Sequence, residues 1–216
     1  MTPSLPLRTR LLQQARCGKP NRIRGFSLVE ILVAIVVLSF GMLGMVGMQA
    51  YSLQSNRDAR LQAQAASLAR ELAELVRSNR VTAVKTGVDN PYLGTFSTPL
   101  AMTTPSYCLS SANAATGCAT PAAVATAQMT EWLARVDDEL PGARIAVCFD
   151  ASPYDSNGMP QWSCNATGSD EIMVIKIGWT RSSTNRSQTG DTALDRATDT
   201  GSRPYLVFPV TSGRAT

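Results

Sequence analysis

A long apolar run near the N-terminus constrains this chain more than any other feature. Residues 26–48 are apolar except for two serines, three glycines and one carboxylate, Glu30. At about 1.5 Å per residue, a helix over this run can cross a hydrocarbon core about 30 Å thick. An ordinary secretory signal has an apolar core of about 7–15 residues followed by a small-x-small cleavage site. This run is longer and is followed by only a poor site, so the pattern predicts a membrane anchor that stays on the chain.

Positive charge is concentrated before the apolar run. No acidic residue precedes Glu30, and six basic residues do: Arg8, Arg10, Arg16, Lys19, Arg22 and Arg24. From residue 26 onward, 14 basic residues stand against 16 acidic ones, although the whole chain has a formal charge of +4. Basic residues flanking an apolar segment remain on the cytoplasmic side of the membrane. The asymmetry therefore predicts a cytoplasmic N-terminus and a globular part on the other side of the membrane.

Residues 18–80 resemble a known family. The stretch GFSLVE at residues 25–30, after a basic leader and before the apolar run, resembles the N-terminus of a type IV prepilin. The following stretch at residues 52–80, SLQSNRDARLQAQAASLARELAELVRSNR, resembles the PilV class of minor pilins, the type IV pilus modification proteins. In that family a prepilin peptidase cuts after the glycine and methylates the new N-terminus. The resemblance therefore implies cleavage between Gly25 and Phe26 and N-methylation of Phe26.

The same resemblance suggests a role for Glu30. Cleavage would create a charged amine on Phe26, about one helical turn before the carboxylate. In a bundle of such helices, the Glu30 carboxylate of one subunit can meet the Phe26 amine of its neighbour. An unpaired charge costs on the order of 2.5–3.5 kcal/mol at the centre of the bilayer and less near its interface. Pairing relieves this cost only when the subunits are in register, so we expect Glu30 to set subunit registry. The alternative is an interfacial side chain that reaches the headgroup region without a partner.

Three glycines in the apolar run allow two interpretations. Gly41, Gly44 and Gly47 each cost about 1 kcal/mol relative to alanine in a helix interior, so they could mark a segment that stretches or melts when the helix leaves lipid for a filament. Small residues also let membrane helices approach closely. The sequence leaves both interpretations open.

Downstream of the anchor, the pattern predicts further helix. Apolar residues recur at three- and four-residue spacings over residues 52–86, which indicates an amphipathic continuation of the anchor; they are Leu53, Leu61, Ala65, Leu68, Leu72, Leu75 and Val76. Residues 87–127, rich in Gly, Ser, Thr, Ala and Pro, are expected to form a long irregular connection. Residues 128–140 are expected to form a short helix whose apolar side carries Trp132, Leu133, Val136 and Leu140.

The C-terminal third predicts a small antiparallel sheet. Strands are expected at residues 143–150, 170–180 and 204–210, with a mobile polar loop at 181–203. The fold class is therefore α+β, with the long helix packed against the sheet. The expected organisation is a cleaved basic leader (1–25), a transmembrane and assembly helix (26–51), the amphipathic half of the long helix (52–86) and a globular head (87–216).

Cysteine usage fits an oxidising compartment. Cys17 lies in the leader, which leaves four cysteines in the exported part: Cys108, Cys118, Cys148 and Cys164. An even number in an exported domain predicts two disulfides. Three pairings are possible, and proximity in the sequence favours Cys108 with Cys118 and Cys148 with Cys164. A metal site is disfavoured, because the chain has no histidine and no CxxC pair.

The sequence offers no catalytic residues or cofactor site. It contains no histidine, GxSxG, P-loop or GxGxxG. Residues 155–158, Asp-Ser-Asn-Gly, resemble the start of a calcium loop, but no regular ligand series follows, which favours a tight turn. We therefore expect neither an enzyme nor a metal or cofactor.

The function expected from these observations is that of a minor pilin that helps to initiate or cap a type IV pilus, and so serves twitching motility and cell adhesion. Its expected partners are the prepilin peptidase, other minor pilins, the major pilin and the inner membrane. One alternative is a pseudopilin of a type II secretion system, which shares the same N-terminal pattern. Another is a tip binding module or adhesin that uses the loops at 87–127 or 181–203. Nucleic acid is disfavoured as a partner, because the exported part is slightly acidic.

Overall fold

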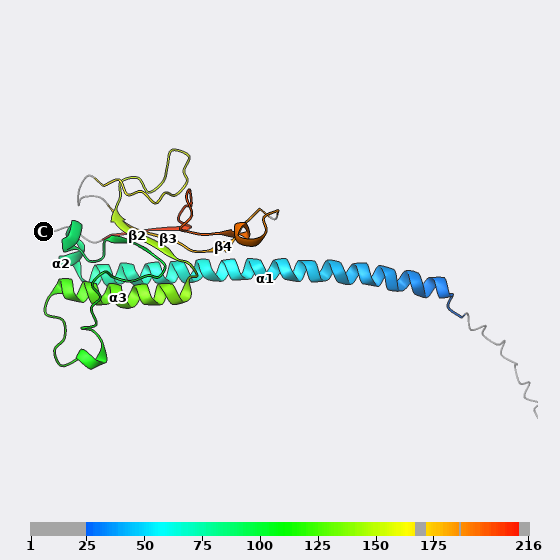
Figure 1. Ribbon diagram of the computed structural model, residues 1–216, viewed down its shortest axis with the longest axis horizontal. Helices are drawn as coiled ribbons and strands as arrows, with labels where there is room; N and C mark the ends of the chain where they lie inside the picture. The colour runs from blue at the N-terminus through cyan, green and yellow to red at the C-terminus, as the bar shows by residue number, and fades with distance from the viewer. Residues whose placement is uncertain (1–24, 167–171, 186, 212–216) are drawn as a thin grey trace, which may run out of the picture. The chain divides into compact units, whose positions relative to one another are not determined.

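The computed structural model describes residues 25–166, 172–185 and 187–211. The leader before Gly25, including Cys17, lies outside the described residues, so its predicted removal is not tested by the fold. The chain divides into two compact units, Met1–Ala50 and Tyr51–Thr216. Helix α1 (Leu28–Ser78) contributes its first part to one unit and its second part to the other (Figure 1). The fold class is α+β, as predicted.

The second unit contains a four-stranded antiparallel sheet. The three predicted strands are confirmed as β2 (Arg144–Phe149), β3 (Met173–Gly178) and β6 (Leu206–Val210). A fourth strand, β1 (Gly94–Ser97), pairs with β2 and gives the order β1-β2-β3-β6. This strand lies within residues 87–127, so the prediction of an entirely irregular connection there was wrong. A run of only four residues, GTFS, is too short to show the alternation by which strands are predicted.

The polar segment at 181–203 also contains regular structure. Strands β4 (Arg181–Ser182) and β5 (Leu194–Asp195) pair with each other, and the 3₁₀ helix η3 (Gly190–Ala193) precedes β5. Two-residue strands leave no periodic signal in the sequence. The predicted loop is therefore partly a short hairpin.

Helix α3 (Pro121–Glu139) begins seven residues before the predicted start at residue 128. The Thr120 hydroxyl accepts a hydrogen bond from the Ala123 N–H at 3.1 Å, and Pro121 occupies the first turn. A threonine cap followed by proline is a strong helix start. The sequence carried this signal, but the Gly, Ser, Thr and Pro content around it favoured a loop.

Helix α1 ends at Ser78, earlier than the predicted end near residue 86. Asn79 leaves the helical conformation, with φ −116° and ψ 52°, and its side-chain amide donates to the Pro121 carbonyl at 2.7 Å. This contact with the start of α3 joins residues far apart in the sequence, so local periodicity could not predict it. A short helix, α2 (Arg80–Ala83), and a 3₁₀ helix, η1 (Gly87–Asp89), follow before β1.

The core of the second unit lies between the helices and the sheet. Helix α3 runs along the C-terminal part of α1, and the Trp132 indole donates to the Leu68 carbonyl at 3.0 Å (Figure 1). Nearly all the predicted apolar residues of the two helices are buried: Leu61, Ala65, Leu68, Leu72, Val76, Trp132, Leu133, Val136 and Leu140. Leu75 is only partly buried, and Leu53 is 71% exposed, so the buried side of α1 starts later than predicted. From the sheet, Ile145, Ile175 and Ile177 complete the core.

The other face of the sheet is covered by the segment between β2 and β3. In Figure 1 this segment lies on the side of the sheet away from α1. It is attached to the sheet by the disulfide Cys148–Cys164 and by a buried ion pair between Lys176 and Asp150. The second unit is thus a helix layer, a sheet and an outer covering segment.

Candidate functional site

The N-terminal end of α1 gathers the residues that the sequence singled out. Gly25, Phe26 and Ser27 precede the helix, and the Ser27 carbonyl accepts the Glu30 N–H at 3.0 Å and the Ile31 N–H at 3.2 Å. Glu30 therefore lies in the first helical turn. A carboxylate there is favoured by the partial positive charge of the helix N-terminus. The structure places Gly25, Phe26 and Glu30 together within one segment.

Every residue from Gly25 to Ala50 is exposed in this chain. Phe26 is 78% exposed and Leu28 85%, and the large apolar residues that follow, up to Met48, are between 44% and 77% exposed. The helix is long and apolar enough to cross a membrane. An apolar surface of this extent around a whole helix requires lipid or other apolar helices as its surroundings. The first unit therefore has the properties of a membrane anchor.

The polar and small residues of this segment need no partner from the rest of the chain. The Ser39 hydroxyl donates to the Ile35 carbonyl at 2.7 Å, which satisfies it within the helix, as a membrane interior requires. At Gly41, Gly44 and Gly47, an added Cβ would meet none of the described atoms within 4 Å. No packing within the described chain requires these glycines. Both interpretations, a helical segment that melts on leaving lipid for a filament and a close contact between membrane helices, therefore involve molecules other than this chain.

Comparison with known families bears on this same segment. Residues 20–46 match the family model of the prokaryotic N-terminal methylation motif. No curated protein and no solved structure matches the chain. The motif supports a type IV pilin-like protein, either a pilin or a pseudopilin, and so indicates a family of structural subunits. It also implies processing by a prepilin peptidase and assembly with other pilins.

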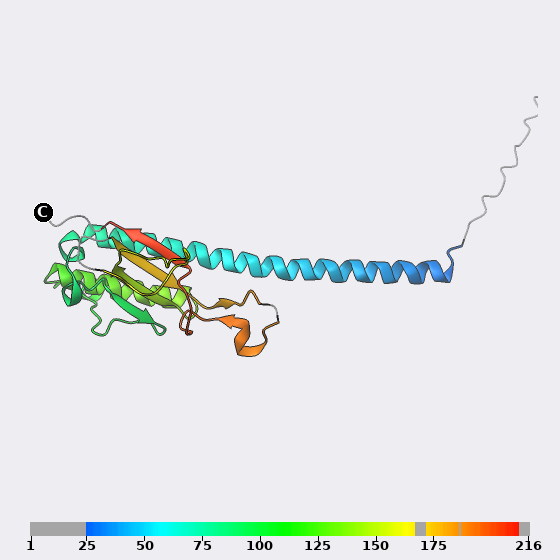
Figure 2. The ribbon, with the colours of Figure 1, turned by 90° about the horizontal axis from the view of Figure 1, so that it is seen from above.

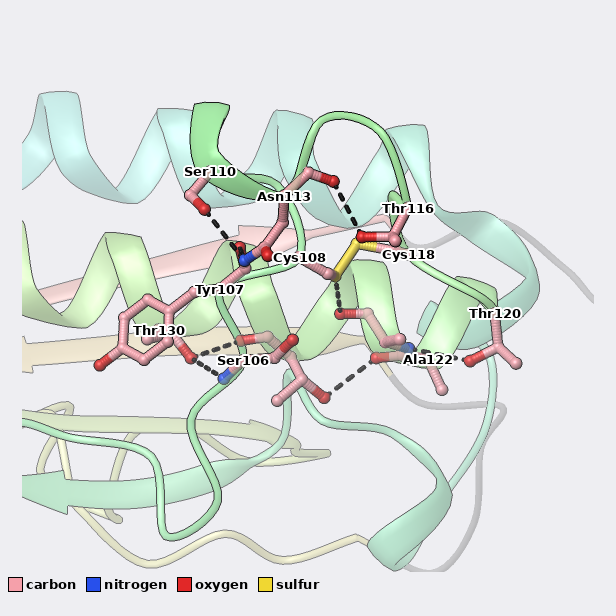
Figure 3. Close-up of a disulfide and its surroundings, with 12 residues drawn as sticks. Ser106, Tyr107, Cys108, Ser110, Asn113, Thr116, Cys118, Thr120, Ala122 and Thr130 are labelled. Carbon is pink, nitrogen blue, oxygen red and sulfur yellow. Dashed lines mark hydrogen bonds between the residues drawn. A yellow bond between two sulfur atoms is a disulfide. The ribbon is translucent and has the colours of Figure 1, made fainter.

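Two disulfides stabilise the loops of the second unit. They join Cys108 to Cys118 and Cys148 to Cys164, the pairings that proximity in the sequence favours. Inside the first loop, the Asn113 amide donates to the Tyr107 carbonyl at 3.0 Å and to the Ser110 hydroxyl at 3.2 Å (Figure 3). The loop also contains the 3₁₀ helix η2 (Ser111–Asn113). The disulfide and these hydrogen bonds fix the loop before α3 begins.

Replacing Cys108 and Cys118 together by serine is expected to lower the free energy of unfolding by about 3 kcal/mol, because the closed loop restricts the unfolded chain. Urea unfolding of the mature protein in non-denaturing detergent measures the loss. The exposed Ser111, in the same loop, provides the control: Ser111→Ala should leave the midpoint nearly unchanged. Native protein whose four cysteines all react with an alkylating agent would contradict both disulfides.

A buried ion pair is the strongest charge interaction among the described residues, and the sequence analysis missed it. The Lys176 ammonium lies 2.5 Å from an Asp150 carboxylate oxygen, and both side chains are 0% exposed. Lys176 also donates to the Ser163 carbonyl at 2.6 Å, and the other Asp150 oxygen accepts the N–H groups of Ser152 and Asn165. The available signal was one lysine between two isoleucines of a strand. Because the pair is enclosed and both charged groups are hydrogen-bonded within the chain, we interpret its role as structural.

Two possible metal sites are accounted for by bonds within the chain. Ligand atoms of Cys148, Asp150 and Cys164 lie within 4.8 Å of one another, but the two sulfurs are bonded to each other and the carboxylate is held by Lys176. Thiolates, not disulfides, bind metals. Asp155 forms the expected tight turn: its carboxylate accepts the N–H groups of Asn157 and Met159, both at 2.9 Å.

Proposed function

We propose that this chain is a minor pilin of the PilV class that helps to initiate or cap a type IV pilus. The observation that carries the proposal is the segment at residues 25–50, in which a glycine–aromatic junction precedes α1, Glu30 lies in the first turn of the helix, and no residue up to Ala50 is buried. The resemblance of residues 52–80 to PilV-class minor pilins selects the pilus over other assemblies. In this proposal residues 1–25 are removed and residues 26–51 anchor and assemble the subunit. Residues 52–86, the amphipathic half of the long helix, connect the anchor to the periplasmic head, which residues 87–216 form.

The proposed role of the N-terminal residues follows from electrostatics. A cleaved Phe26 carries a charged amine, and N-methylation leaves it able to remain charged. In an apolar bundle this amine and the Glu30 carboxylate of a neighbouring subunit would each be costly if left unpaired. Pairing between subunits satisfies both groups in one register. The proposed partners are therefore other minor pilins and the major pilin, with the head delivered to the pilus surface.

Replacing Gly25 with valine is expected to leave uncut precursor in the inner membrane, because a bulky side chain occupies the position before the proposed cut. Immunoblotting of membrane fractions distinguishes precursor from mature chain by the mass of the leader. Gly41→Val is the matched control, since it makes the same substitution at an exposed helix position away from the junction and should be cut normally. Mass spectrometry of the mature wild-type chain should find methylated Phe26 at its N-terminus. An N-terminus beyond Met48 would contradict the proposal.

A pseudopilin of a type II secretion system is the second candidate, because the N-terminal methylation motif is common to both classes. Deleting the gene separates them: loss of piliation and twitching supports the pilus, whereas loss of protein secretion with normal pili supports the pseudopilin.

A further inference from the structure

Strand β1 is an open edge of the four-stranded sheet. It pairs with β2, and the Thr98 N–H, directly after the strand, donates to the Ala143 carbonyl at 3.0 Å in the same register. In an antiparallel pair, hydrogen-bonded residues alternate with residues whose backbone groups point away. Phe96 therefore bonds toward β2, while Thr95 and Ser97 direct their N–H and C=O groups to the free edge.

Within the described chain, these outward backbone groups have no hydrogen-bond partner. Figure 2 shows β1, the green strand, at the outer margin of the sheet. Natural edge strands are commonly protected by a very short length, a charged side chain, a proline or a bulge. Strand β1 has only four residues, so its free edge is confined to the outward groups of Thr95 and Ser97. Here no charged residue occurs between Asp89 and Glu131, and Pro99 comes only after the strand has ended. The edge is thus accessible to another strand.

A groove of about 1060 Å³ follows this edge. Its lining includes Leu93, Phe96 and Met102, which are partly buried and continue the hydrophobic core toward the surface. The lining also includes Thr126 of α3 and the disulfide-bonded Cys148 and Cys164. None of the described residues that line the groove carries a charge.

We propose that β1 receives an extended, uncharged segment of a neighbouring filament subunit, which adds to the sheet as a fifth strand. Strand addition uses backbone hydrogen bonds for affinity and places alternate side chains of the incoming segment in pockets. The lining of the groove sets the chemistry of that segment, because a charged side chain would be desolvated there without a counter-charge. The identification of the partner as a filament subunit rests on the proposed function; the open edge and the groove do not.

Substitutions at Thr95 separate the backbone contribution from that of the side chain. Thr95→Pro deletes an N–H that points outward and leaves the hydrogen bonds to β2 intact, whereas Thr95→Val keeps the N–H. Thr95→Lys keeps the N–H and adds a charge to the edge. We expect about tenfold less association for the proline variant, since one partner carbonyl is left unpaired. The lysine variant should also lose association, and the valine variant should not.

Association is measured in pilus-forming cells with the full chain, using a benzophenone photo-crosslinking amino acid at Ser97 or, as a reference, at the exposed Leu38 of α1. Adducts are mapped to peptides by mass spectrometry. The proposal requires that Ser97 forms adducts with an extended segment of another pilin-type subunit. The yield of these adducts should decrease in the Thr95→Pro and Thr95→Lys variants, while the yield of adducts from Leu38 is unchanged. Unfolding midpoints within error of wild type show that the variants are folded.

Three outcomes would overturn the inference. Ser97 adducts that are insensitive to both substitutions would show that β1 is not the binding edge. Ser97 adducts on a second copy of this chain would replace the proposed partner with self-association. If Ser97 forms no adducts while Leu38 forms them normally, strand addition is rejected and the proposed function is retained. If neither position forms adducts, both strand addition and the proposed function are rejected.

Discussion

Replacing Lys176 with methionine is expected to lower the free energy of unfolding by about 3–5 kcal/mol. The substitution keeps the apolar stem of the side chain but leaves the Asp150 carboxylate, which is 0% exposed, without its cation. It also leaves the Ser163 carbonyl without a donor. Urea unfolding of the mature protein in detergent measures the loss through tryptophan fluorescence, because Trp132 and Trp179 are buried in the same unit.

Two controls identify the cause of this loss. The double variant Lys176→Met with Asp150→Asn should recover part of it, because an amide oxygen can still accept the N–H groups of Ser152 and Asn165 without a charge. Arg135→Met breaks the ion pair with Glu71. The two side chains of this pair are 45% and 34% exposed, so the substitution should lower the free energy of unfolding by less than about 1 kcal/mol. A Lys176→Met loss no larger than that of Arg135→Met would show that water reaches the Asp150 carboxylate.

The same pair predicts how stability depends on pH. Burial by itself raises the pKa of Asp150, but the Lys176 ammonium and the N–H groups of Ser152 and Asn165 outweigh it and hold the pKa below its usual range. A lowered pKa in the folded state means that the contribution is complete above the unfolded value of about 3.9 and is lost as the pH falls through the folded value. Stability should therefore decline below about pH 4, and less steeply in Asp150→Asn.

Local patterns in the sequence predicted the elements that depend on nearby residues. The apolar run predicted the anchor part of α1, and alternating or continuous apolar residues predicted β2, β3 and β6. The end of α1 coincides with the contact between Asn79 and Pro121, and β1 pairs with β2. Neither interaction is local, so neither could be inferred from spacing.

The residues of the candidate site differ in how far the sequence alone predicts their roles. The junction at Gly25 and Phe26 is a linear signal, so the sequence contains it completely. The buried Lys176 pair was hidden, because a lysine in a strand ordinarily indicates an exposed face. Registry through Glu30 involves a second subunit, whereas within one chain the carboxylate is exposed and lies in the first helical turn.

Replacing Glu30 with alanine is expected to abolish entry of this subunit into the filament or its initiating complex. The hypothesis rests on the position of Glu30 near the proposed Phe26 amine, in a helix that is otherwise uncharged up to Met48. Removing the carboxylate takes a charge out of the membrane segment, so insertion should be as good as in wild type or better. The head should keep both disulfides, since none of its described contacts involves Glu30. Crosslinking to other pilins, and restoration of piliation in a deletion strain, measure the loss.

Ser39→Ala is the matched control, because it removes the other polar group of the same helical segment, whose hydrogen bond is internal. It should assemble and piliate normally. Glu30→Gln keeps the size and polarity of the side chain without the charge, so it should fail like the alanine variant if ion pairing sets the register. Full piliation by both Glu30 variants would place the registry signal elsewhere in the chain. Degradation of Glu30→Ala in the membrane would instead show that the carboxylate is needed for the stability of the subunit, before assembly begins.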